Sequence, residues 1–281
     1  MKTITSVTEL QREIKALKRS GRRIGFVPTM GALHEGHLSL ARTLKDFSDV
    51  RVCSIFVNPT QFNDPKDYQA YIINLDKDKA LLEREGVDIL FAPQVDEIYP
   101  KGFQSTVSLA EITKPWEGAS RPGHFNGVAT VVTILFNAVM PDVAIFGEKD
   151  FQQLRLIEQM VRDLKMDIEI LRGDLVRDDD GLALSSRNAR LSVEGRRNSL
   201  AISQGLFAAQ KAARAGETAS AELEGIVSQA VLAVPGAEID YIAAVREDTL
   251  EHVAKISGDC RMLVVVKIDG VRLLDNIALR S

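Results

Sequence analysis

Cysteine is scarce in this sequence, because only Cys53 and Cys260 occur among its 281 residues. Neither belongs to a C-x-x-C pair or a Cys/His cluster, so the sequence offers no zinc site of the usual spacing. So few cysteines fit a reducing compartment, where disulfides are rare. Cys53 lies in VRVCSIFVN, which we predict to be a buried strand. Its thiol is therefore interpreted as structural.

Long apolar runs and an excess of positive charge are also missing. The first residues, MKTITSVTELQREIK, contain no apolar stretch typical of secretion signals, and no run is long enough to span a bilayer. We therefore expect a soluble cytoplasmic protein with no membrane partner. The formal net charge is -4 and the pI about 5.7, which argues against a nucleic-acid partner, because binding phosphate backbones takes many basic residues. A local basic site for a small anion is still allowed.

Apolar strands alternate with helices through the first part of the chain. The segments typical of strands are RRIGFVPT, VRVCSIFVNP, VDILFAP, DVAIFGEKD and MDIEILR. Strands that are apolar on both faces form parallel sheets covered by helices on both sides, with right-handed connections. The predicted fold class is therefore α/β, with a Rossmann-like doubly wound parallel sheet.

The pattern changes near residue 176. Two helical segments, SVEGRRNSLAISQGLFAAQKAARAG and SAELEGIVSQAVLAVPG, precede the strand segments EIDYIAAV, CRMLVVVKI and VRLLDNIAL. Asp269-Gly270 joins the last two strands and is a hairpin signal. We therefore predict a Rossmann-like domain over residues 1–175 and a smaller α+β C-terminal domain over residues 176–281.

The turn PTMGALHEGH follows a predicted strand and carries His34 and His37. Gly31 and Gly36 would let the backbone approach a ligand closely. The helix that follows would direct its N-terminal N–H groups toward an anion, and two imidazoles there would donate hydrogen bonds to phosphate oxygens. On these residues alone, a loop with two surface histidines is an equally good interpretation, because short motifs often match by chance.

A second unusual loop, Gly147-Glu148-Lys149-Asp150, follows another buried strand. The N-terminal end of a helix dipole disfavours a cation. The position of Lys149 is explained if a phosphate binds between its ammonium group and the N-terminus of the helix. The alternative is an ordinary solvated run of charges at a helix start.

A third segment, DGLALSSRNARL, presents Ser185, Ser186 and Arg187 in a row. Two hydroxyls and a guanidinium suit the terminal phosphates of a nucleotide, because arginine binds phosphate bidentately. The alternative is a polar linker whose serine caps a helix.

Uncharged amides follow two of the strands. Asn58 and Gln61 lie in FVNPTQF, and Gln153 follows the GEKD turn. Such amides suit recognition of a hydroxy acid, where orientation matters more than charge. Arg121, in RPGHFNG, is a candidate for binding a carboxylate or a phosphate. Surface hydrogen bonding for the glutamines and a structural role for Arg121 are the alternatives.

Six segments, in the order PTMGALHEGH, IFVNPTQF, RPGHFNGVATVV, FGEKDFQQL, DGLALSSRN and RLLDNIA, extend along nearly the whole chain. Together they resemble the pantothenate synthetase (pantoate–β-alanine ligase) family of the HxGH nucleotidyltransferase superfamily. The resemblance implies that pantoate and ATP give pantoyl adenylate and pyrophosphate, and that the amine of β-alanine then displaces AMP to form pantothenate. It also implies Mg²⁺, a homodimer, and an active site between a nucleotide- and pantoate-binding Rossmann-like domain and a mobile C-terminal lid domain.

The resemblance also gives each candidate residue an expected role. His34, His37, Lys149 and Arg187 are the expected catalytic residues, with His37 as the proton donor. The residues expected to bind pantoate are Gln61, Gln153, Asn58 and Arg121; Gln61 is also expected to bind β-alanine, and Asp78 to lie near the metal. The residues expected to bind ATP are Met30, Gly31, Ala32, Leu33, His34, Glu35, Gly36, His37, Gly147, Glu148, Lys149, Asp150, Val176, Leu184, Ser185, Ser186 and Arg187.

Two segments depart from the pattern of the family. After Tyr71 the family commonly has Pro-Arg-Thr, whereas this chain has Ile72-Ile73-Asn74. The change removes a rigid proline and a cation from a segment expected near the ATP entrance. The stretch LRGDLVRDDDG is also more acidic than expected. Neither departure removes a catalytic candidate.

Three other functions fit the segments less well. Nucleotidyl transfer to a phosphocholine-type or nicotinamide mononucleotide acceptor would share the HxGH turn, but VNPTQF and GEKDFQQL together would not be expected. A regulatory module without catalysis would be expected to lack His37, Lys149 or Arg187. A tRNA-binding synthetase relative is disfavoured by the acidic charge balance and the absence of an evident anticodon-binding domain.

Overall fold

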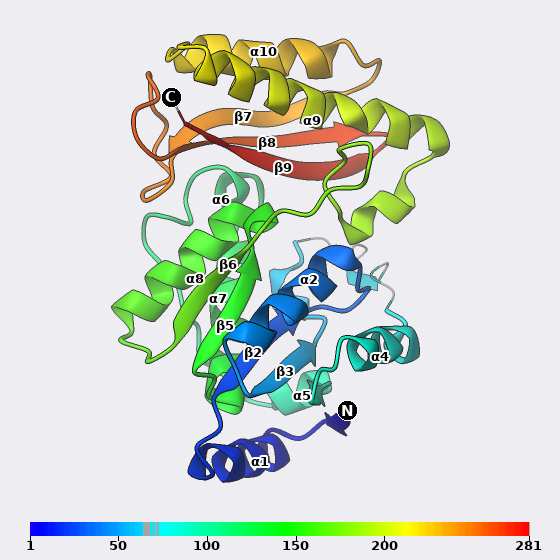
Figure 1. Cartoon of the computed structure of the whole chain (residues 1–281), viewed down its shortest axis with the longest axis vertical. Coiled ribbons are helices and arrows are strands. Elements are labelled where there is room, and N and C mark those ends of the chain that lie inside the picture. The colour runs from blue at the N-terminus through cyan, green and yellow to red at the C-terminus, as the bar shows by residue number, and fades with distance from the viewer. Residues whose placement is uncertain (64–67, 70, 72, 281) are drawn as a thin grey trace. The chain divides into compact units, whose positions relative to one another are not determined.

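Six parallel strands form the larger sheet of the protein, in the order β1-β4-β3-β2-β5-β6 (Figure 1). The computed structural model describes residues 1–63, 68–69, 71 and 73–280. The strands of this sheet are β1 (Lys2–Ile4), β2 (Ile24–Thr29), β3 (Val50–Ile55), β4 (Ile89–Phe91), β5 (Val143–Gly147) and β6 (Glu169–Gly173). The predicted parallel sheet is confirmed. The short edge strand β1 was not predicted, because three residues are too few to show a periodic pattern.

Helices cover both faces of this sheet, as in a doubly wound fold. The helices are α1 (Val7–Arg19), α2 (Glu35–Thr43), α4 (Leu75–Arg84), α5 (Val95–Ile98), α6 (Glu117–Ser120), α7 (His124–Val139) and α8 (Phe151–Asp163). On one face, α2 and α4 share a hydrophobic cluster with Val27 and Cys53. On the other face, Phe136 of α7 packs edge-on against Phe26 and Phe146. Strand residues that alternate in direction therefore bury both faces, which explains their nearly continuous apolar sequence.

Helix α7 forms despite its many β-branched residues. Twelve of its sixteen residues are buried, so packing outweighs the weak helix propensity of valine and threonine. The helix ends at Val139, and the C-cap residue Met140 adopts a left-handed conformation with φ 46° directly before Pro141. It begins at His124, three residues before the apolar run that predicted it.

Three antiparallel strands form the smaller sheet, in the order β7-β8-β9. They are β7 (Glu238–Arg246), β8 (Cys260–Ile268) and β9 (Val271–Leu279), and they follow helices α9 (Val193–Arg214) and α10 (Ser220–Leu232). Buried side chains of both helices share one hydrophobic cluster with β8 and β9. The predicted hairpin is present: Asp269 and Gly270 both have positive φ, 53° and 73°, as a two-residue type I′ turn requires.

The chain divides into two compact units. Met1–Glu148 and Leu156–Asp174 form the first, called here the N-terminal unit; Lys149–Arg155 and Leu175–Ser281 form the second, the C-terminal unit. The sequence pattern predicted a single division after residue 175. The structure also places the short segment Lys149–Arg155 with the C-terminal unit.

The Cys53 thiol has the properties of a structural residue. It is buried in β3, and burial raises its pKa to about 12, so the reactive thiolate is not populated near neutral pH. In the described part of the chain, no helix combines the length and apolar character needed to cross a bilayer.

Candidate active site

The loop after β2 has a tightly constrained backbone. Gly31 and Ala32 both adopt positive φ, 80° and 51°. A Cβ atom on Gly31 would lie 2.8 Å from Cγ2 of Ile73 and 3.0 Å from Oδ2 of Asp78, so only glycine fits. The Thr29 hydroxyl donates to the Ser54 carbonyl at 2.7 Å and accepts the N–H of Gly31 at 3.2 Å. These contacts fix the backbone of the predicted ATP-binding loop where it leaves the sheet.

Asp78 of α4 clamps the same loop. Its side chain is 1% exposed, and its two carboxylate oxygens accept the backbone N–H groups of Ala32 at 2.8 Å and Leu33 at 2.9 Å. Within the described residues, no group of three or more His, Cys, Asp or Glu side chains could hold a metal ion. The metal-binding role of Asp78 stays a prediction, and its geometry favours an anchor for the loop.

Replacing Asp78 by asparagine should separate these two roles. If the Asp78 carboxylate anchors the loop, the variant should lose about 1–3 kcal/mol in the free energy of unfolding, because the asparagine amide leaves one buried backbone N–H without an acceptor. It also predicts a higher KM for ATP and an unchanged Mg²⁺ concentration at half-maximal rate. Asp76→Asn, an exposed position on the same helix, is the control. A raised Mg²⁺ requirement with normal stability would instead identify Asp78 as a metal ligand.

His34 and His37 lie together at the start of α2. The rings have centroids 4.1 Å apart and are tilted by 38°. The backbone N–H of His34 points to Nδ1 of His37 at 3.4 Å, which makes Nδ1 an acceptor and places the His37 proton on Nε2. The predicted pair is therefore brought together beside the N–H groups of the α2 N-terminus.

Gln61, in the turn after β3, contacts the same loop. Its Nε2 donates to Sδ of Met30 at 3.0 Å, and its Oε1 accepts from Nδ2 of Asn58 at 3.0 Å. Asn58 is 1% exposed; its Nδ2 also donates to the Gly127 carbonyl, and its Oδ1 accepts from the Tyr99 hydroxyl at 2.8 Å. Asn58 therefore orients Gln61, and its predicted contact with pantoate stays a prediction.

Arg121, directly after α6, and His124, the first residue of α7, hold the backbone of this turn. The Gln61 carbonyl accepts from Nη2 of Arg121 at 3.2 Å and from Nδ1 of His124 at 2.8 Å, while Nη1 of Arg121 contacts Nε2 of His124 at 3.2 Å. A carbonyl only accepts and a guanidinium only donates, so His124 is neutral with its proton on Nδ1. Arg121 supports the Gln61 turn, which is the structural alternative considered for it.

Gly127 is a supporting residue that sequence reasoning missed. A Cβ at this position of α7 would lie 2.5 Å from the Thr60 carbonyl oxygen and 2.8 Å from the Gln61 nitrogen. The turn that carries Gln61 can therefore approach the helix only at a glycine. A glycine inside an apolar helical pattern was the available signal.

In the C-terminal unit, Val176 and Leu184 pair across a short hairpin. The Leu184 N–H donates to the Val176 carbonyl at 3.0 Å, and the Asp178 N–H donates to Leu182 at 2.8 Å. Arg177 binds Asp275 of β9 bidentately, at 2.6 and 2.8 Å, and its Nη1 also donates to the Gly181 carbonyl. The two predicted ATP-binding backbone positions thus lie at the base of one anchored hairpin.

The unusual acidity of residues 171–181 now has an explanation. Arg196 of α9 pairs with both Asp178 and Asp180, and Arg177 pairs with Asp275. The Arg196 guanidinium lowers the pKa of the Asp180 carboxyl. Two of the aspartates of this stretch, Asp178 and Asp180, therefore fix the hairpin to α9.

Ser185, Ser186 and Arg187 follow this hairpin directly. The Ser185 hydroxyl accepts the Arg187 N–H at 3.2 Å and caps the short 3-10 helix Ser186–Arg190. The predicted contact of this serine with phosphate stays a prediction. Asn188 Nδ2 donates to the Ala183 carbonyl at 3.0 Å. Among the described residues, Arg187 has no ion-pair partner, and a half-buried guanidinium in this state suits an external anion.

Lys149 begins the other part of the C-terminal unit. Its side chain is 19% exposed, and its ammonium lies 3.7 Å from the carboxylate of Asp150. Gln153 lies half-buried in the first turn of α8. Gly147 and Glu148, at the end of β5, belong to the N-terminal unit. The predicted GEKD segment is therefore shared between the units.

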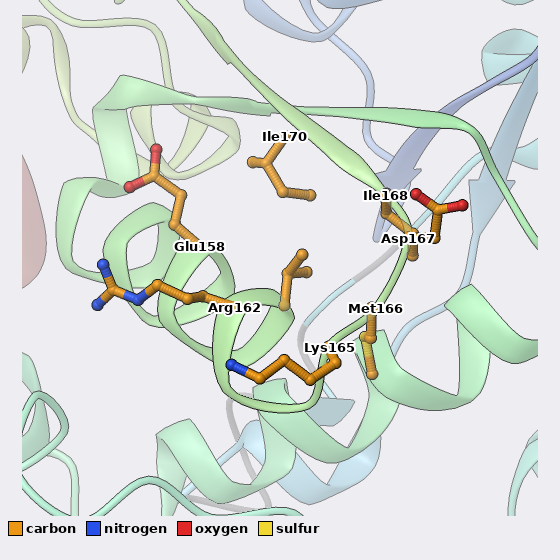
Figure 2. Close-up of a pocket in the computed structure, with 8 residues that line it drawn as sticks. Glu158, Arg162, Lys165, Met166, Asp167, Ile168 and Ile170 are labelled. Atoms are coloured by element: carbon orange, nitrogen blue, oxygen red, sulfur yellow. The ribbon is translucent and has the colours of Figure 1, made fainter.

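A surface pocket of about 480 Å³ lies in the N-terminal unit (Figure 2). The end of α8 and the strand β6 form it, with Val161, Met166, Ile168 and Ile170 among its lining residues. None of the residues predicted to bind ATP, pantoate or β-alanine lines this pocket. It therefore adds nothing to the assignment of the substrate site.

The departure at residues 72–74 is explained in part. Ile72 lies outside the described residues. Ile73 packs against Gly31, and the Asn74 side chain caps α4 by accepting the Lys77 N–H at 3.0 Å. Two of the three residues thus support the loop that carries His34 and the helix that carries Asp78.

Comparisons with known proteins agree along the whole chain. The family model described as "Pantoate-beta-alanine ligase" matches residues 2–278. The pantothenate synthetase of Trichlorobacter lovleyi is 50% identical over 279 residues, or 99% of each chain. That of Geobacter sulfurreducens is 46% identical over 279 residues, again 99% of each chain.

Solved structures give the same result. The crystal structure of pantothenate synthetase from Thermus thermophilus is 44% identical, covers 100% of both chains and has a TM-score of 0.95. The pantoate-β-alanine ligase from Francisella tularensis, crystallised in complex with β-γ ATP and β-alanine, is 35% identical with a TM-score of 0.83. It covers 100% of this chain and 98% of its own.

Proposed function

Because this chain belongs to the pantoate–β-alanine ligase family, we propose that its histidine loop and its C-terminal cations carry out the adenylation of pantoate. The chain is a ligase that condenses pantoate with β-alanine at the expense of ATP. The observation that supports the assignment most strongly is the stacked His34–His37 pair at the N-terminus of α2.

The first half-reaction sets the main chemical difficulty. A carboxylate oxygen of pantoate attacks the α-phosphorus of ATP, the bond to the β-phosphate oxygen breaks, and pyrophosphate leaves. Two anions must approach each other, so the enzyme has to position them and offset phosphate charge. In the second half-reaction, the amine of β-alanine attacks the acyl carbon, loses a proton and expels AMP.

His37 and His34 stabilise charge on the α-phosphate in this proposal. The Nε2–H of a neutral His37 is a hydrogen-bond donor whose orientation is set by the bond at Nδ1. The backbone N–H groups at the start of α2 act on the same anion. Donors fixed in advance are effective because they need no reorganisation as charge develops.

Ser185, Ser186 and Arg187 bind the β- and γ-phosphates and the leaving pyrophosphate, and Lys149 binds phosphate at the same centre as the two histidines. Lys149 and Arg187 supply the positive charge at these two places. The capped turn at Ser185 keeps the backbone at Ser186 and Arg187 in a fixed conformation. The backbone of the Val176–Leu184 hairpin holds the nucleotide in the same proposal.

Gln61 and Gln153 recognise pantoate, and Gln61 also contacts β-alanine. The position of Gln61 depends on Asn58, which holds its amide, and on Arg121, which holds its carbonyl. Because Asn58 and Arg121 are engaged in these contacts, we propose that both act on pantoate through Gln61.

In this proposal, Mg²⁺ binds to the enzyme together with ATP. The carboxylate of Asp78 is engaged by two backbone N–H groups, and the described residues contain no cluster that would hold a metal ion alone. Mg²⁺ is commonly bound through substrate phosphates with few protein ligands. No step assigned to a residue above depends on the metal.

The overall reaction provides the first test. Incubation with pantoate, β-alanine and MgATP should give pantothenate, AMP and pyrophosphate in equal amounts. Formation of ADP and phosphate instead would contradict adenylation, because it requires attack at the γ-phosphorus. Formation of AMP without pantothenate would show that another acceptor is used.

We also propose a homodimer that works in the cytoplasm. The family resemblance implies the dimer, and two buried, unbridged cysteines suit a reducing compartment. Light scattering of the purified protein should give twice the chain mass of 30.9 kDa. A mass of one chain at micromolar concentration would contradict the dimer.

A further inference from the structure

A buried polar chain in the C-terminal unit ends at the main chain of Lys149. Asn276 of β9 donates from Nδ2 to the Lys149 carbonyl at 2.9 Å. Arg261 of β8 donates from Nη1 to Oδ1 of Asn276 at 2.6 Å. Arg261 also binds Oε1 of Glu247 at 2.9 Å. The side chains of Glu247, Arg261 and Asn276 thus form a continuous series of contacts that ends at the Lys149 carbonyl.

The orientation of the Asn276 amide is fixed by this arrangement. A guanidinium can only donate, so the Asn276 oxygen must face Arg261. A carbonyl can only accept, so the Asn276 nitrogen must face Lys149. Asn276 is 3% exposed and Arg261 is 5% exposed, so water does not compete for these bonds.

Arg261 also contacts the residues that follow Lys149. Its guanidinium carbon lies 4.0 Å from the centre of the Phe151 ring, a cation–π distance. At the other end of the segment, Nη2 of Arg155 donates to the Asp248 carbonyl at 3.1 Å. These contacts explain why Lys149–Arg155 belongs to the C-terminal unit although it lies between β5 and the rest of α8.

Burying an arginine costs free energy unless its donors are satisfied. Hydrophobic residues would pack the same sheet face without that cost. We therefore expect the buried guanidinium, whose bonds orient an amide toward one carbonyl, to fix the position of that carbonyl. Fixing the Lys149 carbonyl restricts the backbone at Lys149, and with it the region that the ammonium can reach.

We propose that Asn276, oriented by Arg261, is a positioning residue for Lys149 in adenylate formation. This inference rests on the proposed role of Lys149 as a phosphate-binding cation. Neither Asn276 nor Arg261 needs to touch a substrate. Their contribution is to hold the Lys149 ammonium in its productive position.

Asn276→Asp tests this proposal with little change in shape. The carboxylate still accepts from Arg261, but it cannot donate to the Lys149 carbonyl. The rate of pantoate-dependent pyrophosphate–ATP exchange should fall about 10- to 100-fold, as expected for a displaced catalytic group. The Kd for ATP should change less than about threefold, because positioning acts mainly in the transition state.

The matched control is Gln210→Glu. Gln210 of α9 donates from Nε2 to the Ala278 carbonyl of β9 at 2.8 Å, so this change also removes an amide donor to a main-chain carbonyl. It should lower the melting temperature but leave the exchange rate within about twofold of wild type. Asn276→Ser, which introduces no charge, replaces Asn276→Asp if that variant does not fold.

A double-mutant cycle with Lys149→Ala distinguishes positioning from general damage. Without the ammonium there is nothing to position, so Asn276→Asp should have no further effect on exchange in the Lys149→Ala background. An equal loss in both backgrounds, or a wild-type rate for Asn276→Asp alone, would overturn the proposal. A wild-type rate for Lys149→Ala would instead overturn the catalytic role of Lys149, and with it the function proposed for the Asn276 bond.

Discussion

Replacing His37 by alanine should lower the rate of pantoyl adenylate formation about 100- to 1,000-fold, the usual loss when one fixed donor to a developing charge is removed. The Kd for ATP should rise only a few-fold. His37 is proposed to act when charge builds on the α-phosphate, whereas the backbone groups of residues 30–37 are proposed to contribute to ground-state binding of ATP. Single-turnover adenylate formation and equilibrium ATP binding measure the two quantities separately.

His37→Gln is the matched variant for this prediction. Its amide can donate one hydrogen bond near the position of Nε2, so it should recover part of the lost rate. His252→Gln serves as a control in the other unit, because His252 pairs with Glu224 and is not one of the predicted site residues. Equal losses in adenylate formation and in ATP affinity would contradict a transition-state role for His37.

Replacing Arg177 by methionine should lower the free energy of unfolding of the C-terminal unit by about 3–5 kcal/mol, because it leaves the Asp275 carboxylate buried without its partner. Asp275 is 4% exposed and receives two short bonds from this guanidinium. Methionine retains bulk against Phe207, whose ring lies 5.1 Å from the guanidinium carbon. Denaturant unfolding measures the loss.

The loss should depend on pH with a defined sign. Burial raises the pKa of Asp275 above its ordinary value of 3.8, and Arg177 opposes this rise. Without Arg177, the pKa in the folded state rises further. A folded state that holds its proton more tightly than the unfolded state loses stability as pH increases through this range. The variant should therefore be closer to wild type at about pH 5 than at about pH 7.5.

The double variant Arg177→Met/Asp275→Asn is the control. It removes the carboxylate together with its partner, so it should recover much of the stability and lose the added pH dependence. A deficit below about 1 kcal/mol that is the same at both pH values would show that the pair is a minor surface-like interaction.

The sequence predicted five of the six strands of the larger sheet, β2 to β6, because their signal is local. Valine-, isoleucine- and phenylalanine-rich runs such as VRVCSIFVN have to be buried on both faces. Asp269-Gly270 predicted the last hairpin because a type I′ turn needs two residues that tolerate positive φ. The site loops were predictable for the same reason, since they follow the ends of those strands.

The supporting contacts were not predictable, because they join residues distant in sequence. Asp78 was expected near a metal from the family resemblance, yet its carboxylate binds the backbone of Ala32 and Leu33, about 45 residues away. Asn276 lies 127 residues from Lys149. No periodic pattern records such pairs, and only the folded chain shows which polar side chains are already engaged.

The measurement that tests the central claim most directly is exchange of labelled pyrophosphate into ATP, with pantoate and Mg²⁺ present and β-alanine withheld. Reversible formation of pantoyl adenylate predicts exchange that requires pantoate and is lost in the His37→Ala enzyme. An enzyme that binds ATP but shows no pantoate-dependent exchange would contradict adenylation of pantoate by the residues assigned here.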